Sequence, residues 1–130
     1  MKIATWNVNS LNVRLPRVLA WLAAAQPDVL CLQETKMEDA KFPHREIAEA
    51  GYAASFAGQR TYNGVALLVR DGAGTADDAV TALPNFADEQ KRVIAATVGG
   101  TRIVDFYVPN GEAVDSAKYR YKLDWCRAAT

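Results

Sequence analysis

Hydrophobic and polar positions follow two different periods in the first third of the chain. Residues 2–7 and 28–36 are short, mostly apolar runs that become polar near their C-terminal ends, which is typical of buried strands. Between them, residues 14–26 carry apolar side chains at helical spacing, at Leu15, Val18, Leu19 and Leu22. Pro27 ends this helix. The pattern predicts a strand–helix–strand unit, with antiparallel neighbours allowed between the two strands.

The remaining positions predict mainly strands. A short helix is expected at residues 45–50, with Gly51 as its C-terminal cap. Strands are then expected at residues 53–57, 65–70, 79–83, 93–98 and 102–107. Gly99 and Gly100 form a two-residue hairpin turn between the last two strands, and residues 58–64 form a longer loop.

A final helix is expected after Asp115, which would cap it, with Tyr119, Leu123 and Cys126 at helical spacing. The fold class is therefore α/β (α+β), with a mixed, mostly antiparallel sheet and flanking helices. The sheet reads as half of a two-sheet sandwich whose second layer is absent.

Composition limits the size and class of the protein but does not select a function. The 130 residues fit one small domain or part of a larger one, and 50% hydrophobic residues are enough for a core. Fifteen basic residues balance fifteen acidic ones, so the net charge neither supports nor excludes a nucleic-acid partner. Cys31 and Cys126 lie far apart and are expected to be reduced. Without an apolar leader or a run long enough to cross a bilayer, a soluble cytoplasmic protein with no membrane partner is expected.

Asn7 and Glu34 are the first candidates for chemistry, because each follows an apolar strand. If the two strands are neighbours, an amide and a carboxylate meet at one edge of the sheet, where sites of layered α/β proteins form. A carboxylate beside an amide suits Mg²⁺, which keeps several waters and binds phosphate. The structural alternatives are an exposed loop carboxylate for Glu34 and, for Asn7, an asparagine that hydrogen-bonds its own backbone.

Four segments together resemble a known family: residues 6–11 (WNVNSL), 26–36 (QPDVLCLQETK), 64–68 (GVALL) and 107–111 (YVPNG). Their order and spacing are similar to those of the bacterial exonuclease III family of DNA repair nucleases, which includes apurinic/apyrimidinic endonucleases within the endonuclease/exonuclease/phosphatase superfamily. The resemblance extends from Met1 to about Trp125.

The resemblance implies a four-layer α/β sandwich, of which residues 1–130 would be the N-terminal part of a single domain. It also implies a Mg²⁺-dependent enzyme, with Mn²⁺ as an alternative ion, that acts as a 3′–5′ exodeoxyribonuclease and abasic-site endonuclease on double-stranded DNA. An Asp-x-Asn motif and an Asp-His pair of that family are not found in the sequence, whose single histidine, His44, lies in a polar segment. We therefore expect a truncated member or fragment that is nearly inactive by itself.

Residue roles follow from the same resemblance. Glu34 is expected to bind the metal, and Asn7 to orient the phosphate or a metal-bound water and to contribute to the metal site. Tyr107 is expected to donate its hydroxyl to the scissile phosphate; its alternative role is packing at a strand end. Expected contacts to the DNA backbone are Lys36, Arg60, Arg92 and Asn110, with Lys41 as a further candidate.

Alternatives remain open. The chain could belong to another branch of the superfamily, such as a phosphatase or lipid phosphodiesterase, or it could be a non-catalytic DNA-binding or assembly module. A full-length family member is expected to be monomeric, whereas a half-sandwich with an uncovered apolar face is expected to self-associate. The run Tyr119-Arg120-Tyr121-Lys122 could stack on single-stranded DNA, but at helical spacing we interpret it as packing.

Overall fold

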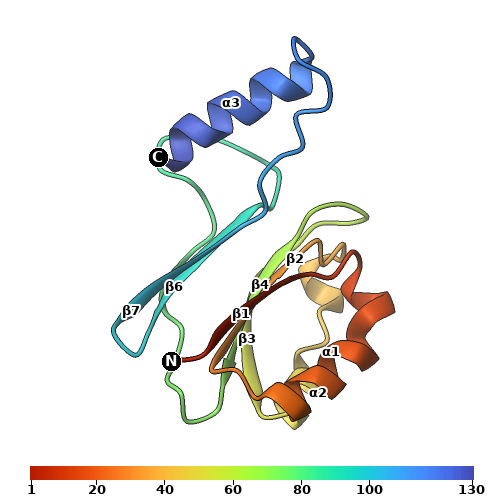
Figure 1. Cartoon of the computed structure of the whole chain (residues 1–130), viewed down its shortest axis with the longest axis vertical. Coiled ribbons are helices and arrows are strands. Elements are labelled where there is room, and N and C mark those ends of the chain that lie inside the picture. Colours follow the sequence, from red (N-terminus) through yellow and green to blue (C-terminus); the bar gives the residue numbers. More distant parts are fainter.

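The structure is a computed structural model that describes residues 1–130 and contains two facing sheets (Figure 1). The first sheet has the strand order β1-β2-β4-β3. Strands β1 and β2 are parallel, and the other pairs are antiparallel, which confirms the predicted mixed sheet. Its strands are β1 (Ile3–Asn7), β2 (Val29–Gln33), β3 (Tyr52–Ala57) and β4 (Val65–Arg70).

Helix α1 (Leu11–Ala25) forms the predicted crossover between the parallel strands. It begins three residues earlier than the spacing indicated, because the Ser10 side chain accepts a hydrogen bond from the Val13 N–H at 3.4 Å and caps the first turn. Its C-terminus follows the prediction: Gln26 adopts a left-handed conformation directly before Pro27.

Helix α2 (His44–Glu49) follows a short 3₁₀ turn (Asp39–Lys41) and lies with α1 on the outer face of the first sheet (Figure 1). Gly51, with φ of +88°, ends this helix as predicted. His44 is exposed at the start of this helix, and its ring stacks on Phe56 with centroids 6.4 Å apart.

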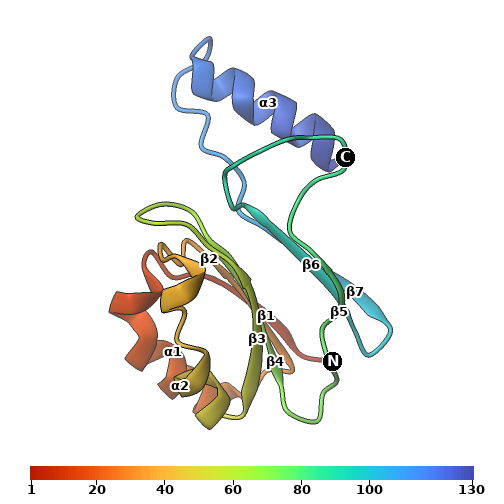
Figure 2. The ribbon, with the colours of Figure 1, turned by 180° about the vertical axis from the view of Figure 1, so that it is seen from behind.

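The second sheet has the order β5-β6-β7 and packs on the face of the first sheet opposite the helices (Figure 2). It consists of β5 (Asp77–Val80), β6 (Val93–Val98) and β7 (Thr101–Phe106). Gly99 and Gly100 both have positive φ and form the predicted hairpin turn. The expectation that a second layer would be absent is wrong, because these three strands supply it.

Strand β2 is covered on both faces, and all five of its residues are buried. Leu30 and Leu32 face the helices, whereas Val29 and Cys31 belong to the apolar layer between the sheets. This explains why the sequence showed a continuous apolar run instead of an alternation. The layer between the sheets contains Val29, Cys31, Ala57, Val65, Leu67, Val69, Ile94, Ala96, Val98 and Ile103.

Helix α3 (Ala117–Ala129) lies beyond the ends of β6 and β7, away from the first sheet (Figures 1 and 2). Its cap is Ser116 and not Asp115: the Ser116 hydroxyl accepts a hydrogen bond from the Tyr119 N–H at 3.0 Å, whereas Asp115 occupies the preceding position with φ of +70°. The Phe106 and Trp125 rings meet edge to face with centroids 5.2 Å apart and fasten the helix to β7.

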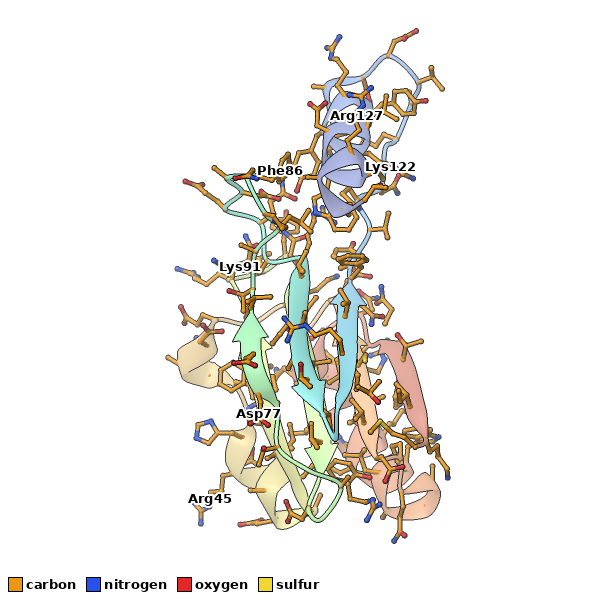
Figure 3. All side chains as sticks on the ribbon, turned by 90° about the vertical axis from the view of Figure 1, so that its left-hand side faces the viewer. Arg45, Asp77, Phe86, Lys91, Lys122 and Arg127 are labelled. Atoms are coloured by element: carbon orange, nitrogen blue, oxygen red, sulfur yellow. The ribbon has the colours of Figure 1, made fainter.

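The outer face of the second sheet is the side seen in Figure 3, with Asp77 on β5 at its edge. Val80 and Val104 are exposed on this sheet. Both cysteines are free, as expected, with Cys31 buried. None of the three α-helices has the length and apolar character that a membrane crossing requires.

Candidate active site at the strand ends

The C-terminal ends of β1 and β2 lie side by side, which is the condition under which Asn7 and Glu34 were expected to meet. Asn7 is opposite Gln33 in the parallel register, and Glu34 is the next residue of the chain. Glu34 has a left-handed backbone, with φ of +57°, and its side chain is 22% exposed. Its carbonyl oxygen accepts a hydrogen bond from the Ser10 N–H at 2.8 Å, so the segment after β1 holds the turn that presents the carboxylate.

Gly64 supports the same turn from the side of β4. The Thr35 N–H donates to the Gly64 carbonyl oxygen at 3.2 Å. Gly64 has φ of +97°, and a Cβ atom on it would lie 2.0 Å from Thr35 Oγ1. The glycine before β4 therefore allows the close approach that fixes the residue after Glu34.

Asn7 makes the local turn contact that was its structural alternative: its Oδ1 accepts the Asn9 N–H at 3.1 Å. Asn9 in turn accepts a hydrogen bond from Lys36 Nζ at 2.6 Å, and that ammonium lies 3.7 Å from Glu34 Oε1. Lys36 thus balances the Glu34 charge. The structure brings Asn7, Glu34 and Lys36 to one edge of the first sheet.

Tyr107 reaches this edge from the second sheet. Burial raises the pKa of Tyr107, and the neighbouring Glu34 carboxylate raises it further against the opposing effect of Arg92. The hydroxyl is therefore a protonated donor beside a carboxylate at neutral pH. Carboxylate and phenol, far apart in sequence, form one polar site where β2 and β7 end.

Arg92 packs on Tyr107 and binds its backbone. The guanidinium carbon lies 4.7 Å from the ring centroid, and Nη1 donates to the Tyr107 carbonyl oxygen at 3.2 Å. The Tyr107 N–H donates to the Arg92 carbonyl oxygen at 2.8 Å. These contacts fix the end of β7 and leave a cation next to the phenol.

A polar cavity of about 480 Å³ opens in front of these residues. Asn110 lines it, with its Oδ1 accepting the Glu112 N–H at 2.9 Å. Figure 3 places Phe86 and Lys91 at the α3 end of the second sheet, in the segment that leads into β6. The cavity is lined by Gln59, Tyr62, Asn63, Gln90, Arg92, Tyr107, Asn110, Glu112, Lys118 and Tyr121.

The other basic candidates lie elsewhere. Lys36, Lys41 and Arg60 line a separate depression of about 330 Å³, together with Asn12 and Thr61. Lys36, Lys41 and Arg60 therefore form one group of candidate cations on the loops after β2 and β3, whereas Arg92 lies apart from them, directly before β6.

Tyr121 was missed as a component of this region. Its hydroxyl donates to Asp88 Oδ2 at 2.5 Å, and the Arg92 guanidinium lies 5.7 Å from its ring centroid. Arg92 thus contacts one aromatic ring directly after β7 and another on α3. The run from Tyr119 to Lys122 predicted only packing, because the contact joins distant segments and leaves no local pattern.

Glu34 is a single carboxylate, and the residues described contain no group of three or more His, Cys, Asp or Glu side chains that could enclose a metal ion. A half-buried carboxylate with a neighbouring amide fits Mg²⁺, which takes one or two protein oxygens and completes its shell from waters and phosphate. It does not fit zinc, which takes three or four protein ligands, most of them Cys and His.

Two facing sheets with helices on the outer side, and a carboxylate and a phenol meeting where strands of both sheets end, are features of a class of metal-dependent phosphoesterases. The family model described as "Endonuclease/Exonuclease/phosphatase family" matches residues 4–129, and the chain belongs to this family.

Its relatives lie in the exonuclease III and apurinic/apyrimidinic endonuclease branch, as the resemblance implied. The chain is 33% identical to exodeoxyribonuclease III of Haemophilus influenzae and 31% identical to the DNA repair nuclease APEX1 of Danio rerio. These alignments cover 87% and 96% of the chain but 43% and 41% of the relatives. The chain thus spans less than half the length of these curated relatives.

Solved structures show the same relationship. A 3′–5′ exonuclease (NExo) from Neisseria meningitidis superposes with a TM-score of 0.94 at 49% identity, over 99% of this chain and 50% of that one. An AP endonuclease from Archaeoglobus fulgidus superposes with a TM-score of 0.93 at 40% identity, over 99% of this chain and 49% of that one. The predicted half of an α/β sandwich is confirmed.

Proposed function

We propose that residues 1–130 are the N-terminal part of a single nuclease domain that hydrolyses DNA phosphodiesters in repair, as a 3′–5′ exodeoxyribonuclease and abasic-site endonuclease. The single observation that carries the proposal is the placement of Glu34 and Tyr107 at the neighbouring ends of β2 and β7, which the Gln33–Asp105 hydrogen bond of 2.7 Å joins and where the Glu34 carboxylate raises the pKa of Tyr107. The exonuclease and AP endonuclease descriptions of the structural relatives support it. The free, buried thiol of Cys31 is compatible with a reducing, cytoplasmic location.

Glu34 would hold a Mg²⁺ ion, or Mn²⁺ in its place, and Asn7 would complete the site through its amide oxygen or a bridging water. When bound, the ion supplies positive charge that polarises the scissile phosphate. Lys36, already 3.7 Å from Glu34, would turn toward a phosphate once Glu34 is engaged. The Tyr107 hydroxyl would donate to a phosphate oxygen as negative charge develops there.

Double-stranded DNA, with abasic sites or 3′ ends, is the proposed partner. Arg92 and Asn110 would contact one stretch of backbone at the larger cavity, and Lys36 and Arg60 another at the smaller depression. Such contacts position the duplex without reading its sequence. Because residues 1–130 supply a single carboxylate at the site, we propose that they bind Mg²⁺ weakly and turn over little DNA by themselves.

A second candidate activity is removal of a 3′ phosphate. A structure described as 3′ phosphatase NExo from Neisseria, bound to product DNA hairpin, superposes with a TM-score of 0.95 at 49% identity. A phosphate monoester carries more negative charge than a diester at neutral pH, but both are hydrolysed by attack of water on phosphorus, so the same metal ion and hydroxyl donor can serve both.

The test compares a labelled duplex with one abasic-site analogue and a duplex ending in a 3′ phosphate, each with Mg²⁺ and with EDTA. The complete protein that contains residues 1–130 should incise the first in a Mg²⁺-dependent manner and lose at least about 100-fold in rate on Glu34→Ala. The control is Glu49→Ala, an exposed carboxylate on α2 that is paired with Arg45. Hydrolysis of the 3′ phosphate alone would replace the endonuclease proposal with the phosphatase one. Rapid turnover by residues 1–130 would refute the claim that they need further groups.

A further inference from the structure

The apolar layer between the two sheets contains one carboxyl group, that of Asp105. Its residue is 2% exposed, and it lies on β7 next to the inward-facing Ile103 row. An apolar side chain of similar size would remove the cost of burying a carboxyl group here. The position of Asp105 therefore requires a reason other than packing.

Gln33 is the partner of Asp105 across the layer. Its Nε2 donates to Asp105 Oδ1 at 2.7 Å and to Thr5 Oγ1 at 2.9 Å, and it lies 3.4 Å from the Cys31 carbonyl oxygen. One buried amide thus links β7 of the second sheet to β2 and β1 of the first.

The pair lies directly beneath the candidate active site. Gln33 is the residue before Glu34, and Asp105 is two residues before Tyr107, on the same face of the extended segment. The hydrogen bond therefore joins the two segments that carry the Glu34 carboxylate and the Tyr107 hydroxyl. The surrounding apolar contacts are non-directional, whereas a short hydrogen bond fixes both distance and register.

We propose that Gln33 and Asp105 are positioning residues, whose hydrogen bond between the sheets sets the separation of the Glu34 carboxylate from the Tyr107 hydroxyl. The catalytic meaning of that separation rests on the proposed nuclease function; the geometric claim does not. The bond acts through the backbone, by holding the ends of β2 and β7 at one distance, and neither side chain contacts the substrate.

Asp105 Oδ2 is buried and has no hydrogen-bond partner, so Gln33 uses only one of the two carboxyl oxygens. An asparagine would keep the Oδ1 acceptor, whereas a leucine, which has the same branched arrangement of heavy atoms but larger methyl groups, would remove it. Asp105→Asn is therefore the conservative variant, and Asp105→Leu and Gln33→Met each delete the bond from one side.

The test measures the coupling between Glu34 and Tyr107 by NMR in the full chain, at one pH and without metal or DNA. Tyrosine is labelled at ¹³Cζ, and the Tyr107 signal is assigned with Tyr107→Phe. The readout is the change in the ¹³Cζ chemical shift of Tyr107 that Glu34→Gln causes. It is measured in the wild-type protein and in each variant of Gln33 and Asp105, as a double-mutant cycle. Val104→Ala, an outward-facing neighbour on β7, is the matched control.

The change should keep its full size in the wild-type, Asp105→Asn and Val104→Ala backgrounds and fall below half in Asp105→Leu and Gln33→Met. A full-sized change in both deletion variants would overturn the proposal, as would the absence of any change in the wild-type background. Should Asp105→Leu lose its folded circular-dichroism spectrum, Gln33→Met decides. Because the NMR measurement needs no turnover, its result tests the positioning role independently of the proposed nuclease activity.

Discussion

Tyr121 on α3 donates its hydroxyl hydrogen to Asp88 at 2.5 Å and so fixes the C-terminal helix to the segment that precedes β6. The same ring lies 6.3 Å from the Phe86 ring. Since Arg92 follows in this segment and packs on Tyr107, the helix supports one side of the candidate active site.

Tyr121→Phe should loosen this attachment by about 1 kcal/mol, the typical value of a hydrogen bond, while keeping the ring. Hydrogen exchange of the α3 amides should accelerate, with less effect on the amides of β2. Tyr119→Phe is the control, since it removes a hydroxyl from the same helix while leaving the Asp88 bond in place. Equal acceleration in both variants would show that the Asp88 bond does not hold the helix.

Gly64→Ala should destabilise the chain by more than about 2 kcal/mol, because it combines a positive φ with a steric collision. The new Cβ atom would lie 2.0 Å from Thr35 Oγ1. Gly72→Ala is the matched control: its φ of +85° is similar, but no atom lies within 4 Å of the added Cβ. Urea unfolding of both variants separates collision from backbone strain, and equal losses would mean that Thr35 moves aside.

Asp105 should make stability depend on pH. Burial raises the pKa of Asp105 to about 7, against the opposing effect of the hydrogen bond from Gln33. Because the folded chain resists ionisation of this group, its stabilising contribution is complete below the unfolded pKa and is lost as pH rises through 7. A shift of about three pKa units corresponds to about 4 kcal/mol.

Urea unfolding at about pH 4 and about pH 8 should therefore show a smaller loss of stability in Asp105→Asn than in the wild type. Cys31, the titratable group that interacts with Asp105, does not interfere, since burial and the Asp105 charge raise the pKa of its thiol to about 12. Asp71→Asn, an exposed carboxylate, serves as the control. The same pH dependence in all three proteins would assign it to other groups.

Arg92→Ala should weaken duplex binding and reduce the slope of log affinity against log salt by about 1, the value for one lost phosphate contact. Fluorescence anisotropy of a labelled duplex over a salt series measures both. Arg45→Ala is the control, because Arg45 is 84% exposed on α2 and paired with Glu49, at the far end of the molecule from α3 (Figure 3). An unchanged slope in Arg92→Ala would remove this residue from the DNA interface.

The strands and the helices were largely predictable, because each carries a local pattern. The strand–helix–strand pattern predicted that Asn7 and Glu34 lie at the ends of two neighbouring strands, which are parallel in the structure. The two consecutive glycines predicted the turn at Gly99-Gly100. The second layer was not predictable from local pattern, since β6 reads as apolar on both faces whether or not another sheet covers it.

The contacts between distant segments explain the other errors. The Gln33–Asp105 bond and the Tyr121–Asp88 bond join residues 72 and 33 positions apart, and neither leaves a periodic signal. The cap of α3 was misplaced by one residue because Asp115 and Ser116 are both good capping residues, and only the backbone conformation distinguishes them. The roles of Glu34, Asn7 and Tyr107 remain predictions, and the cleavage assay with Glu34→Ala tests the first of them.

Because both faces of β2 are covered, the fold should tolerate no change in the number of residues in this strand. Leu30 and Leu32 pack toward the helices, while Cys31 and Gln33 point toward the second sheet. Deleting one residue from this strand would exchange the two rows, placing the amide of Gln33 among the helix-facing leucines and rotating Glu34 away from Tyr107. Substitutions within β2 can be graded in their effects, whereas a single-residue insertion or deletion would disrupt the core and the candidate site together.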